Sequence, residues 1–344
     1  TKCVGGLEVE MSDGAPLTVD CLLVATGRRP MTQNLGLEAA GVALRENGAV
    51  AVDEHSRTNV ESIYAVGDAV VKKDAQDGSD VLVPLANTAN LQGRRVADVI
   101  AGAGAAVRPV LGTAIVGVFG LQVGSTGWNE KRLRASGRPY RAIHTHPSDH
   151  AGYYPGATTI ALKLLVDPAN DAILGAQGVG TAGVDKRIDI IATAMAGGLR
   201  AAELADLELA YAPQFGSAKD PVNMLGFVDE NQVRGLSDTV QWHELDAALA
   251  DGASLIDVRT PGEFAAGSIP GAVLIPVDEL RERITDLPAG PLVVHCAVGI
   301  RGHLAAMLLR QQGREVRNLD GGYRTWAAGM AASQARESAS GAHG

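Results

Sequence analysis

The chain has 344 residues, of which 46% are apolar, and its formal net charge is −9. This length predicts two or three domains, each with enough apolar side chains for a core. The acidic balance argues against a nucleic-acid-binding protein, which concentrates Lys and Arg on one face, and no apolar stretch is long enough to span a membrane. Cys3, Cys21 and Cys296 are too widely spaced for a disulfide framework or a structural zinc site, so a reducing cytoplasm is expected.

The beginning of the chain predicts two strands. Residues 6–11 alternate apolar and polar side chains, whereas residues 20–27, "DCLLVATG", form a continuous apolar run typical of a buried strand. Burial in that strand should block access to Cys21. The chain has no initial Met, and neither strand has an earlier element to pair with. We therefore expect the chain to start in the middle of a domain.

The next segments predict short elements and then a mixed domain. Residues 46–70 predict short strands that end at Gly67 and Asp68, and residues 84–102 predict a loop that enters a helix near Asn87. A joint rich in Gly and Ala follows at 101–109. Beyond it the pattern predicts strands, and helices between them, at 113–127 (strands), 128–136 (helix), 141–147 and 158–168 (strands) and 184–197 (helix).

The C-terminal part predicts a small parallel α/β domain that begins near residues 233–238. Four short apolar runs, "ASLIDVR", "AVLIPV", "PLVVHC" and "EVRNLDGG", alternate there with helical segments. The last dozen residues have a composition typical of disorder. The expected organisation is α/β and α+β multidomain, with boundaries that give the segments 1–107, 108–232, 233–330 and a disordered tail at 331–344.

One glycine triplet fits a dinucleotide-binding turn. Gly178, Gly180 and Gly183 lie between an apolar run and a helical pattern, and such glycines let a backbone approach a pyrophosphate closely. A spacing this short also arises by chance. The segments around the triplet therefore decide whether it binds a dinucleotide.

The strongest chemical signal is the segment 293–313, in which a strand delivers Cys296 to a tight loop that runs into an amphipathic helix. Loop amides and the positive end of the helix favour a thiolate, and Arg301 adds a positive charge. These features predict a nucleophilic cysteine. The alternative is that Cys296 is a small apolar residue buried at a strand end.

Three motifs surround this cysteine in a recognisable order. They are "LIDVRTPGEFAAGSIPGAVLIP" (255–276), the loop from Cys296 to Arg301, and "NLDGGYRTW" (318–326). Together they resemble the rhodanese family across 238–330. The resemblance implies that Cys296 carries a sulfane sulfur as a persulfide beside Arg301. It further implies that Asp257 and Arg259 fix the loop, while Ser268 and Gly302 stand where the family usually has His and Ser.

A second resemblance covers the first block. The motifs "LLVATGRRP" (22–30), "IYAVGDAV" (63–70) and "VPLANTANLQGR" (83–94) are similar to the second half of the flavin domain in the pyridine nucleotide-disulfide oxidoreductases. Asp68 can accept hydrogen bonds from ribityl hydroxyls, and the helix near Asn87 can direct its N-terminal amides at the flavin ring. The resemblance implies an FAD site formed by Thr26, Gly27, Gly67, Asp68, Pro84, Leu85, Ala86 and Asn90.

The middle block resembles the dimerisation domain of the coenzyme A-disulfide and persulfide reductases over 108–230. The motifs are "HPSDHAGYYPGATTIALKLL", "GVDKRIDIIATAMAGGL" and "LAYAPQFGSAKDPVNMLGF". The resemblance implies that the glycine triplet joins a strand to an interface helix and binds no nucleotide. It also implies that Tyr211 and Tyr153 reach the partner's active site and donate a proton or hydrogen bond to a CoA thiolate. Interface packing is the alternative for both, and Tyr154 competes with Tyr153.

These resemblances imply the C-terminal portion of an FAD-dependent reductase of CoA disulfides, persulfides or polysulfides, driven by NAD(P)H, dimeric and fused to a rhodanese. The chain shows no first FAD glycine loop, nicotinamide loop or flavin-linked redox Cys, so it is expected to lack reductase activity by itself. The alternatives are a sulfurtransferase on a dimerising platform and a non-enzymatic dimerising fragment. A metal site at His144, His146 and His150 is disfavoured, because no Cys or well-placed carboxylate accompanies them.

Overall fold

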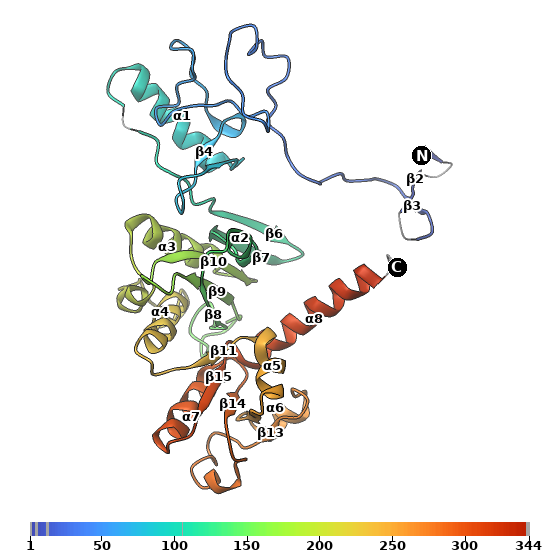
Figure 1. Cartoon of the computed structure of the whole chain (residues 1–344), viewed down its shortest axis with the longest axis vertical. Coiled ribbons are helices and arrows are strands. Elements are labelled where there is room, and N and C mark those ends of the chain that lie inside the picture. Colours follow the sequence, from blue (N-terminus) through green and yellow to red (C-terminus); the bar gives the residue numbers. More distant parts are fainter. Residues whose placement is uncertain (1, 4–5, 12–13, 105, 342–344) are drawn as a thin grey trace. The chain divides into compact units, whose positions relative to one another are not determined.

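The structure is a computed structural model that describes residues 2–3, 6–11, 14–104 and 106–341. The chain divides into two compact units (Figure 1). The first unit comprises Thr1–Lys72, Asp80–Arg108 and Ala328–Gly344, and the second comprises Lys73–Ser79 and Pro109–Ala327. The first unit has a buried apolar cluster around Val50, and the second unit has larger ones in each of its two sheets.

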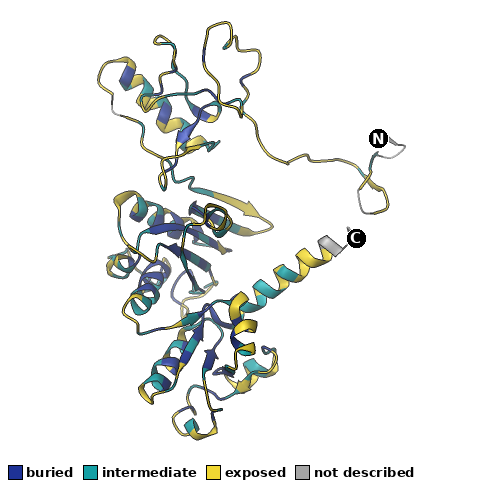
Figure 2. Cartoon of the chain, in the orientation of Figure 1, coloured by how far each residue is buried: buried dark blue, intermediate teal, exposed yellow. Residues whose placement is uncertain are grey.

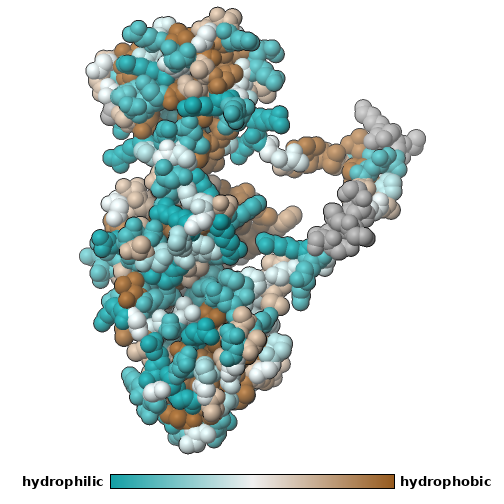
Figure 3. Space-filling model, in the orientation of Figure 1, coloured by the Kyte–Doolittle hydropathy of each residue, from teal (hydrophilic) through white to brown (hydrophobic). Residues whose placement is uncertain are grey.

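The first unit opens with a small antiparallel sheet of β1 (Lys2–Cys3), β2 (Gly6–Val9) and β3 (Leu17–Val19). The buried strand predicted at 20–27 is wrong, because no strand forms there and Cys21 is exposed. Leu23 is 86% exposed, and Figure 3 shows hydrophobic atoms along the extended segment that follows β3. Among the described strands none pairs with this run, so its apolar side chains remain in solvent.

The rest of the first unit contains α1 (Ala86–Ile100), which confirms the helix predicted near Asn87, and a small apolar cluster centred on Val42, Val50 and Val70. The strands predicted at 46–70 are reduced to isolated bridges and a short 3-10 helix, η1 (Gly67–Ala69). One reason is Asp53, whose carboxylate accepts hydrogen bonds from the amides of His55 and Arg57 and thereby turns the chain. Two further short strands are β4 (Lys72–Lys73) and β5 (Asp80–Val81).

The first half of the second unit is an antiparallel five-stranded sheet in the order β6-β7-β10-β9-β8. Its strands are β6 (Ala114–Val118), β7 (Leu121–Gly127), β8 (Arg141–Thr145), β9 (Ala161–Val166) and β10 (Ile173–Gly180). Its helices are α2 (Glu130–Ser136), α3 (Val184–Gly197), η2 (Ala202–Asp206) and α4 (Pro221–Val233). These elements confirm the strands and helices predicted for 113–197.

The glycine triplet lies where β10 meets α3. A side chain at Gly178 would place its Cβ 3.0 Å from Val184 and 3.1 Å from Leu162, so glycine allows the helix to pack closely on the strand. Gly183 has a φ of +71° and begins α3. The glycines therefore serve a strand–helix junction, as the resemblance to the dimerisation domain implies.

The second half of this unit is a parallel sheet in the order β11-β15-β14-β12-β13. Its strands are β11 (Thr239–Val240), β12 (Ser254–Asp257), β13 (Val273–Leu274), β14 (Leu292–His295) and β15 (Val316–Leu319). Figure 2 shows that the central strands are buried. The flanking helices are η3 (Trp242–Glu244), α5 (Leu245–Ala250), α6 (Pro261–Ala265), η4 (Ile284–Asp286) and α7 (Ile300–Gln311). The four predicted strands and the parallel α/β fold are confirmed.

The disordered tail predicted at 331–344 is wrong through Gly341, because α8 (Gly322–Gly341) continues to that residue. The segment is rich in Ala, the best helix former, and contains no Pro, so nothing stops the helix that begins at Gly322. Residues 342–344 lie outside the described residues. Among the helices in the described part of the chain, none combines the length and the apolar content needed to cross a membrane.

Candidate active site

Cys296 lies at the carboxyl end of β14, directly before α7. Its side chain is fully buried, and the amide of Gly299 donates a hydrogen bond to its Sγ atom at 3.2 Å. Gly299 has a φ of +101°, which bends the chain back over the sulfur and starts the helix. The thiol therefore sits inside the bend of the loop at a helix N-terminus, as the sequence predicts.

The start of α8 supports the loop from the other side. The amide of Tyr323 donates to the carbonyl of Cys296 at 2.8 Å, and the amide of Arg324 donates to the carbonyl of Ala297 at 3.0 Å. A side chain at Gly322 would place its Cβ only 2.4 Å from the Cys296 carbonyl oxygen. Glycine at this position thus lets the two backbones meet, which fixes the orientation of Cys296.

Arg301 is paired with a carboxylate that sequence reasoning missed. Its two terminal nitrogens donate to the Glu263 oxygens at 2.8 and 2.7 Å. The hydrogen bond from Arg301 is the main cause that lowers the pKa of Glu263 to about 2, and the same bond is the main cause that raises the pKa of Arg301. Glu263 therefore offsets part of the positive charge that Arg301 brings to the loop. The signal in the sequence was Thr260, which forms a capping box with Glu263 and places it on α6.

Asp257 and Arg259 form a buried pair behind the loop. The Nη2 atom of Arg259 donates to Asp257 Oδ2 at 2.7 Å and to the carbonyl of Gly267 at 2.7 Å, and its guanidinium lies 4.3 Å from the centre of the Tyr323 ring. His295 Nε2 lies 3.6 Å from Asp257, and burial lowers the pKa of His295. These contacts hold the flanks of the loop, in agreement with the supporting role that the resemblance implies.

Gly302, which stands where the rhodanese family usually has Ser, has a packing role. A Cβ at this position would lie 2.2 Å from Asn318 Oδ1, so only glycine leaves room for that amide. Asn318 uses the room to donate from Nδ2 to the carbonyl of Gly299 at 3.1 Å. The departure from Ser is thus coupled to a further hydrogen bond to the loop.

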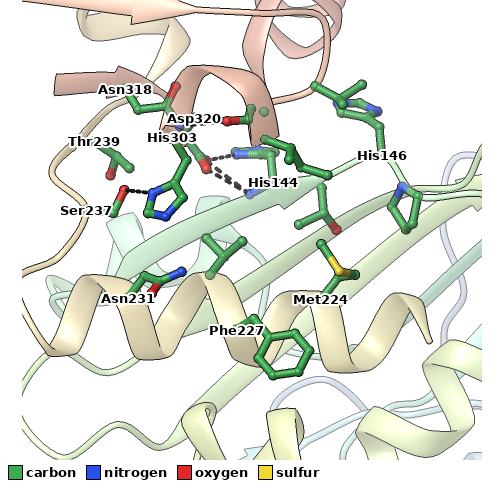
Figure 4. Close-up of a pocket in the computed structure, with 17 residues that line it drawn as sticks. His144, His146, Met224, Phe227, Asn231, Ser237, Thr239, His303, Asn318 and Asp320 are labelled. Carbon is green, nitrogen blue, oxygen red and sulfur yellow. Dashed lines mark hydrogen bonds and ion pairs between the residues drawn. The ribbon is translucent and has the colours of Figure 1, made fainter. Parts of the chain in front are cut away.

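A cavity of about 160 Å³ lies between the loop and α4 (Figure 4). Met224 and Phe227 contribute an apolar wall from α4, while Val298 and Ile300 contribute from the loop. His144 from β8 and His303 from α7 add imidazole groups (Figure 4). Cys296 is not among the residues that line the cavity, so the cavity meets the outside of the loop and not the sulfur.

Two hydrogen bonds join the three motifs of the expected FAD site within the first unit. Arg28 donates to the carbonyl of Pro84 at 3.0 Å, which joins the first motif to the third. The amide of Gly67 donates to Gln92 at 3.0 Å, which joins the second motif to α1. Most of the set is solvent-accessible: Thr26, Gly27, Asp68, Ala86 and Asn90 are exposed, Pro84 and Leu85 are half-buried, and Gly67 is buried.

Lys72 is a structural residue of this region that sequence reasoning missed. Only 5% of it is exposed, and its ammonium group donates to the carbonyls of Gly67 at 2.9 Å and Val83 at 2.7 Å. Burial lowers the pKa of Lys72, and Asp68 opposes that shift. Lys72 thus ties together the second and third FAD motifs. Nothing in the pair "KK" distinguishes it from an ordinary surface lysine.

Tyr153 and Tyr211 lie together, with their hydroxyl oxygens 2.8 Å apart. The hydrogen bond between the two hydroxyl groups is the main cause that raises the pKa of Tyr211, so this phenol stays protonated. Both rings are exposed, whereas Tyr154 packs edge-on against His150. The structure therefore pairs Tyr153, and not its neighbour Tyr154, with Tyr211.

The three histidines of the H-x-H-x3-H pattern have separate partners. His144 pairs with Asp320 at 2.6 Å, His146 bonds to Thr325 at 2.7 Å, and His150 pairs with Asp149 at 2.7 Å. Within the ranges that the structure describes, no group of three or more His, Cys, Asp or Glu side chains could hold a metal ion.

We expect His146 to make the second unit less stable in acid. Burial is the main cause that lowers the pKa of His146 from 6.5 to about 4, with His144 and Arg324 adding to the shift and Asp320 opposing it. Between these pH values the unfolded chain binds the proton more tightly, so stability is full above about pH 6.5 and falls by up to roughly 3 kcal/mol toward pH 4. In His146→Gln, the urea midpoint at mildly acidic pH should lie closer to the midpoint at neutral pH than it does in wild type. An equal pH dependence in the variant and in wild type would contradict the role given to His146.

Comparisons with known proteins match the same segments of the chain to known families. The family models that match are "Pyridine nucleotide-disulphide oxidoreductase" at residues 2–93, its "dimerisation domain" at 113–221, and "Rhodanese-like domain" at 241–329. The chain therefore carries domains of the pyridine nucleotide-disulphide oxidoreductase type and a C-terminal rhodanese-like domain.

Several known proteins are similar to this chain. Reduced CoADR-RHD of Bacillus anthracis is 43% identical with a TM-score of 0.89, and the match covers 93% of this chain and 57% of that one. An NAD-dependent persulfide reductase from A. fulgidus is 37% identical with a TM-score of 0.84, covering 93% and 58%. The coenzyme A disulfide reductase of Staphylococcus haemolyticus is 34% identical over 64% of this chain and 49% of its own length. The chain thus spans about half the length of the curated relatives it matches.

Proposed function

We propose that this chain belongs to an FAD-dependent reductase of CoA disulfides, persulfides or polysulfides, in which Cys296 carries sulfane sulfur. The proposed parts are half of an FAD/NAD(P)-binding region at 1–107, a dimerisation domain at 108–232 and a rhodanese domain at 233–330. The proposal is supported by the three family models and by relatives whose names include CoA disulfide and persulfide reductases.

The observation that carries the sulfur-transfer proposal is the closed loop around the Cys296 thiol. Gly299 donates to its sulfur, Tyr323 holds its carbonyl, and Arg301 acts on it with a positive charge that Glu263 shares. All these groups belong to the second unit. The loop therefore needs nothing from the first unit to bind a sulfur atom.

The proposed reaction has two displacement steps. With thiosulfate as the donor, the Cys296 thiolate attacks the sulfane sulfur, the bond between the two donor sulfur atoms breaks, and sulfite leaves with the electron pair. The product is a persulfide on Cys296. An acceptor such as cyanide or a CoA thiolate then attacks the outer sulfur, takes it, and returns Cys296 to the thiolate. Loop amides stabilise the negative charge in both states.

The experiment that tests this function is a thiosulfate:cyanide transfer assay of the purified chain. We expect turnover with thiosulfate that saturates with donor concentration. No formation of thiocyanate by the folded chain would contradict the proposal and would leave the dimerising fragment as the better interpretation.

The second part of the proposal concerns FAD. Gly67, Asp68 and the N-terminus of α1 (Ala86–Ile100) are suited to the ribityl chain and the flavin ring. The N-cap residue Leu85 makes no side-chain cap, while the Thr88 amide donates to Asn87 Oδ1 at 2.7 Å. FAD, when bound, supplies two-electron transfer between NAD(P)H and a thiol–disulfide couple. The reductase step of the whole protein would consume NAD(P)H and a proton, release sulfide and return CoA thiol.

We expect the 344-residue chain by itself to bind FAD weakly or not at all. Thr26, Gly27 and Asp68 are exposed, and the sequence holds no glycine loop for the pyrophosphate in this region. Gel filtration in the presence of FAD, followed by absorbance of the protein peak, measures retention. A stoichiometric yellow complex would contradict the expectation.

The tyrosine pair fits a role at the reductase site. The phenol of Tyr211, whose pKa is raised, can donate a hydrogen bond or proton to a departing CoA thiolate, with Tyr153 holding it in place. In the homodimer, each pair would serve the partner's active site. Because both side chains are exposed, they are available for such contact.

We expect the chain to form a homodimer through residues 108–230. Strand β6 (Ala114–Val118) is an edge strand that exposes apolar side chains, with Val116 55% exposed and Phe119 beyond it fully exposed. A second copy of this chain would bury them. The double variant Val116→Lys/Phe119→Lys should be a monomer in sedimentation velocity, while Leu304→Lys on α7 stays dimeric. A monomeric wild type at micromolar concentration would contradict the proposal.

The fusion of the two activities has a physical advantage, because a tethered sulfur carrier raises the effective concentration of persulfide near the reductase. The proposed partners are small sulfur donors, CoA thiols and CoA disulfides. The free thiols of Cys21 and Cys296 fit a reducing cytoplasm.

A further inference from the structure

A buried set of contacts joins the rhodanese-like domain to the antiparallel sheet next to the sulfur loop. His144, on β8 (Arg141–Thr145), donates from its amide to Asp320 at 3.0 Å, and its Nδ1 atom lies 2.6 Å from the same carboxylate (Figure 4). Asp320 is only 3% exposed, so its charge is shielded from water. The residues of this pair are 176 positions apart in the chain.

Asp320 has further donors that fix its carboxylate. The side chain of Gln241 donates to Asp320 at 3.2 Å and to the carbonyl of Ala142 on β8 at 3.0 Å. The amide of Asp320 donates to the carbonyl of Val240 at 3.0 Å. The carboxylate is therefore held between the two domains, and loss of one donor leaves a buried charge short of a partner.

Gly321 and Gly322 connect Asp320 to Tyr323, whose amide contacts the sulfur loop. Gly321 packs against His144, since a Cβ on that glycine would lie 2.8 Å from the His144 Cβ. Gly322 abuts the Cys296 carbonyl, and the next amide, that of Tyr323, donates to it at 2.8 Å. Because close contacts confine both glycines, a displacement of Asp320 would also displace the backbone that contacts the Cys296 carbonyl.

We propose that His144 is a positioning residue for sulfur transfer, which acts through Asp320 and the Gly321–Gly322 turn on the carbonyl of Cys296. The dimerisation domain thereby sets the geometry of the sulfur-carrying loop. This inference rests on the proposed sulfurtransferase function. It predicts a role for a residue outside the rhodanese domain that makes no contact with the sulfur.

The test measures thiosulfate:cyanide transfer by the full chain carrying His144→Ala, His144→Asn or Asp320→Asn. We expect His144→Ala to lower kcat about 10-fold or more with little change in the KM for thiosulfate, because the loop is misplaced and its donor contacts remain. His144→Asn, whose amide can replace the Nδ1 donor, should recover most of kcat. The double variant His144→Ala/Asp320→Asn should lose less activity than the two single effects multiplied together, because both substitutions break the same contact.

Controls separate positioning from folding and from the function itself. His243→Ala removes an exposed histidine of the rhodanese domain and should leave kcat unchanged. Circular dichroism at the assay temperature verifies that each variant is folded. Unchanged kcat in folded His144→Ala, while Cys296→Ser is inactive, would overturn the positioning role alone. Full activity of Cys296→Ser would instead overturn the proposed function.

Discussion

Replacement of Cys296 by Ser should abolish thiosulfate:cyanide transfer, with a loss of roughly 10³-fold or more. The serine hydroxyl fits the loop, but it is a far weaker nucleophile than a thiolate and cannot form a persulfide. Because the Cys296 side chain is buried against Gly299, the substitution should leave the fold intact. Initial rates over a range of thiosulfate concentrations provide the measurement.

Two matched variants complete this prediction. Cys21→Ser, at an exposed cysteine in the other unit, should retain transfer activity. Arg301→Ala should reduce turnover by about 10²-fold without removing the nucleophile, because the charge beside the sulfur is lost. Comparable activity in Cys296→Ser and wild type would show that the sulfur travels by another route.

Replacement of Arg259 by Leu should destabilise the second unit by about 3–5 kcal/mol, since it leaves the fully buried Asp257 without its cation. The guanidinium also spans Gly267 and the Tyr323 ring, so the loop flanks lose two further contacts. Urea unfolding followed by tryptophan fluorescence measures the loss. A double variant, Asp257→Leu/Arg259→Leu, should recover part of it, because the uncompensated charge is gone.

The matched control is Arg283→Leu in the same domain. Arg283 pairs with Glu279 and Asp286 at 2.9 Å, but its side chain is 40% exposed. Removal of such a surface pair should cost under about 1 kcal/mol. Equal destabilisation by the two arginine substitutions would contradict the supporting role given to the buried pair.

The sequence predicted best those features that local patterns encode. Four short apolar runs predicted the parallel sheet, and the Cys296 loop followed from one strand, one glycine and one amphipathic helix in series. The same local reasoning failed at residues 20–27, where an apolar run had no strand to pair with and Cys21 remained exposed. It also failed at α8 (Gly322–Gly341), because a composition typical of disorder was continuous with an Ala-rich helix.

Contacts between distant residues left little trace in the sequence. Glu263 faces Arg301 from 38 positions away, and His144 faces Asp320 from 176 positions away. Lys72 looks like a surface residue until the fold buries it between two backbone carbonyls. The position of Cys296 in a loop between a strand and a helix was therefore predictable, whereas the residues that pair with Arg301 and hold the loop required the tertiary structure.

The most direct test of the central claim is the intact-peptide mass of the Cys296 segment after incubation of the chain with thiosulfate or a persulfide donor. We expect this peptide to gain the mass of one sulfur atom, which reducing agents and cyanide remove. We also expect no such gain on the peptide that contains Cys21. An unmodified Cys296 peptide in a folded chain supplied with excess donor would contradict the assignment of Cys296 as the sulfur carrier.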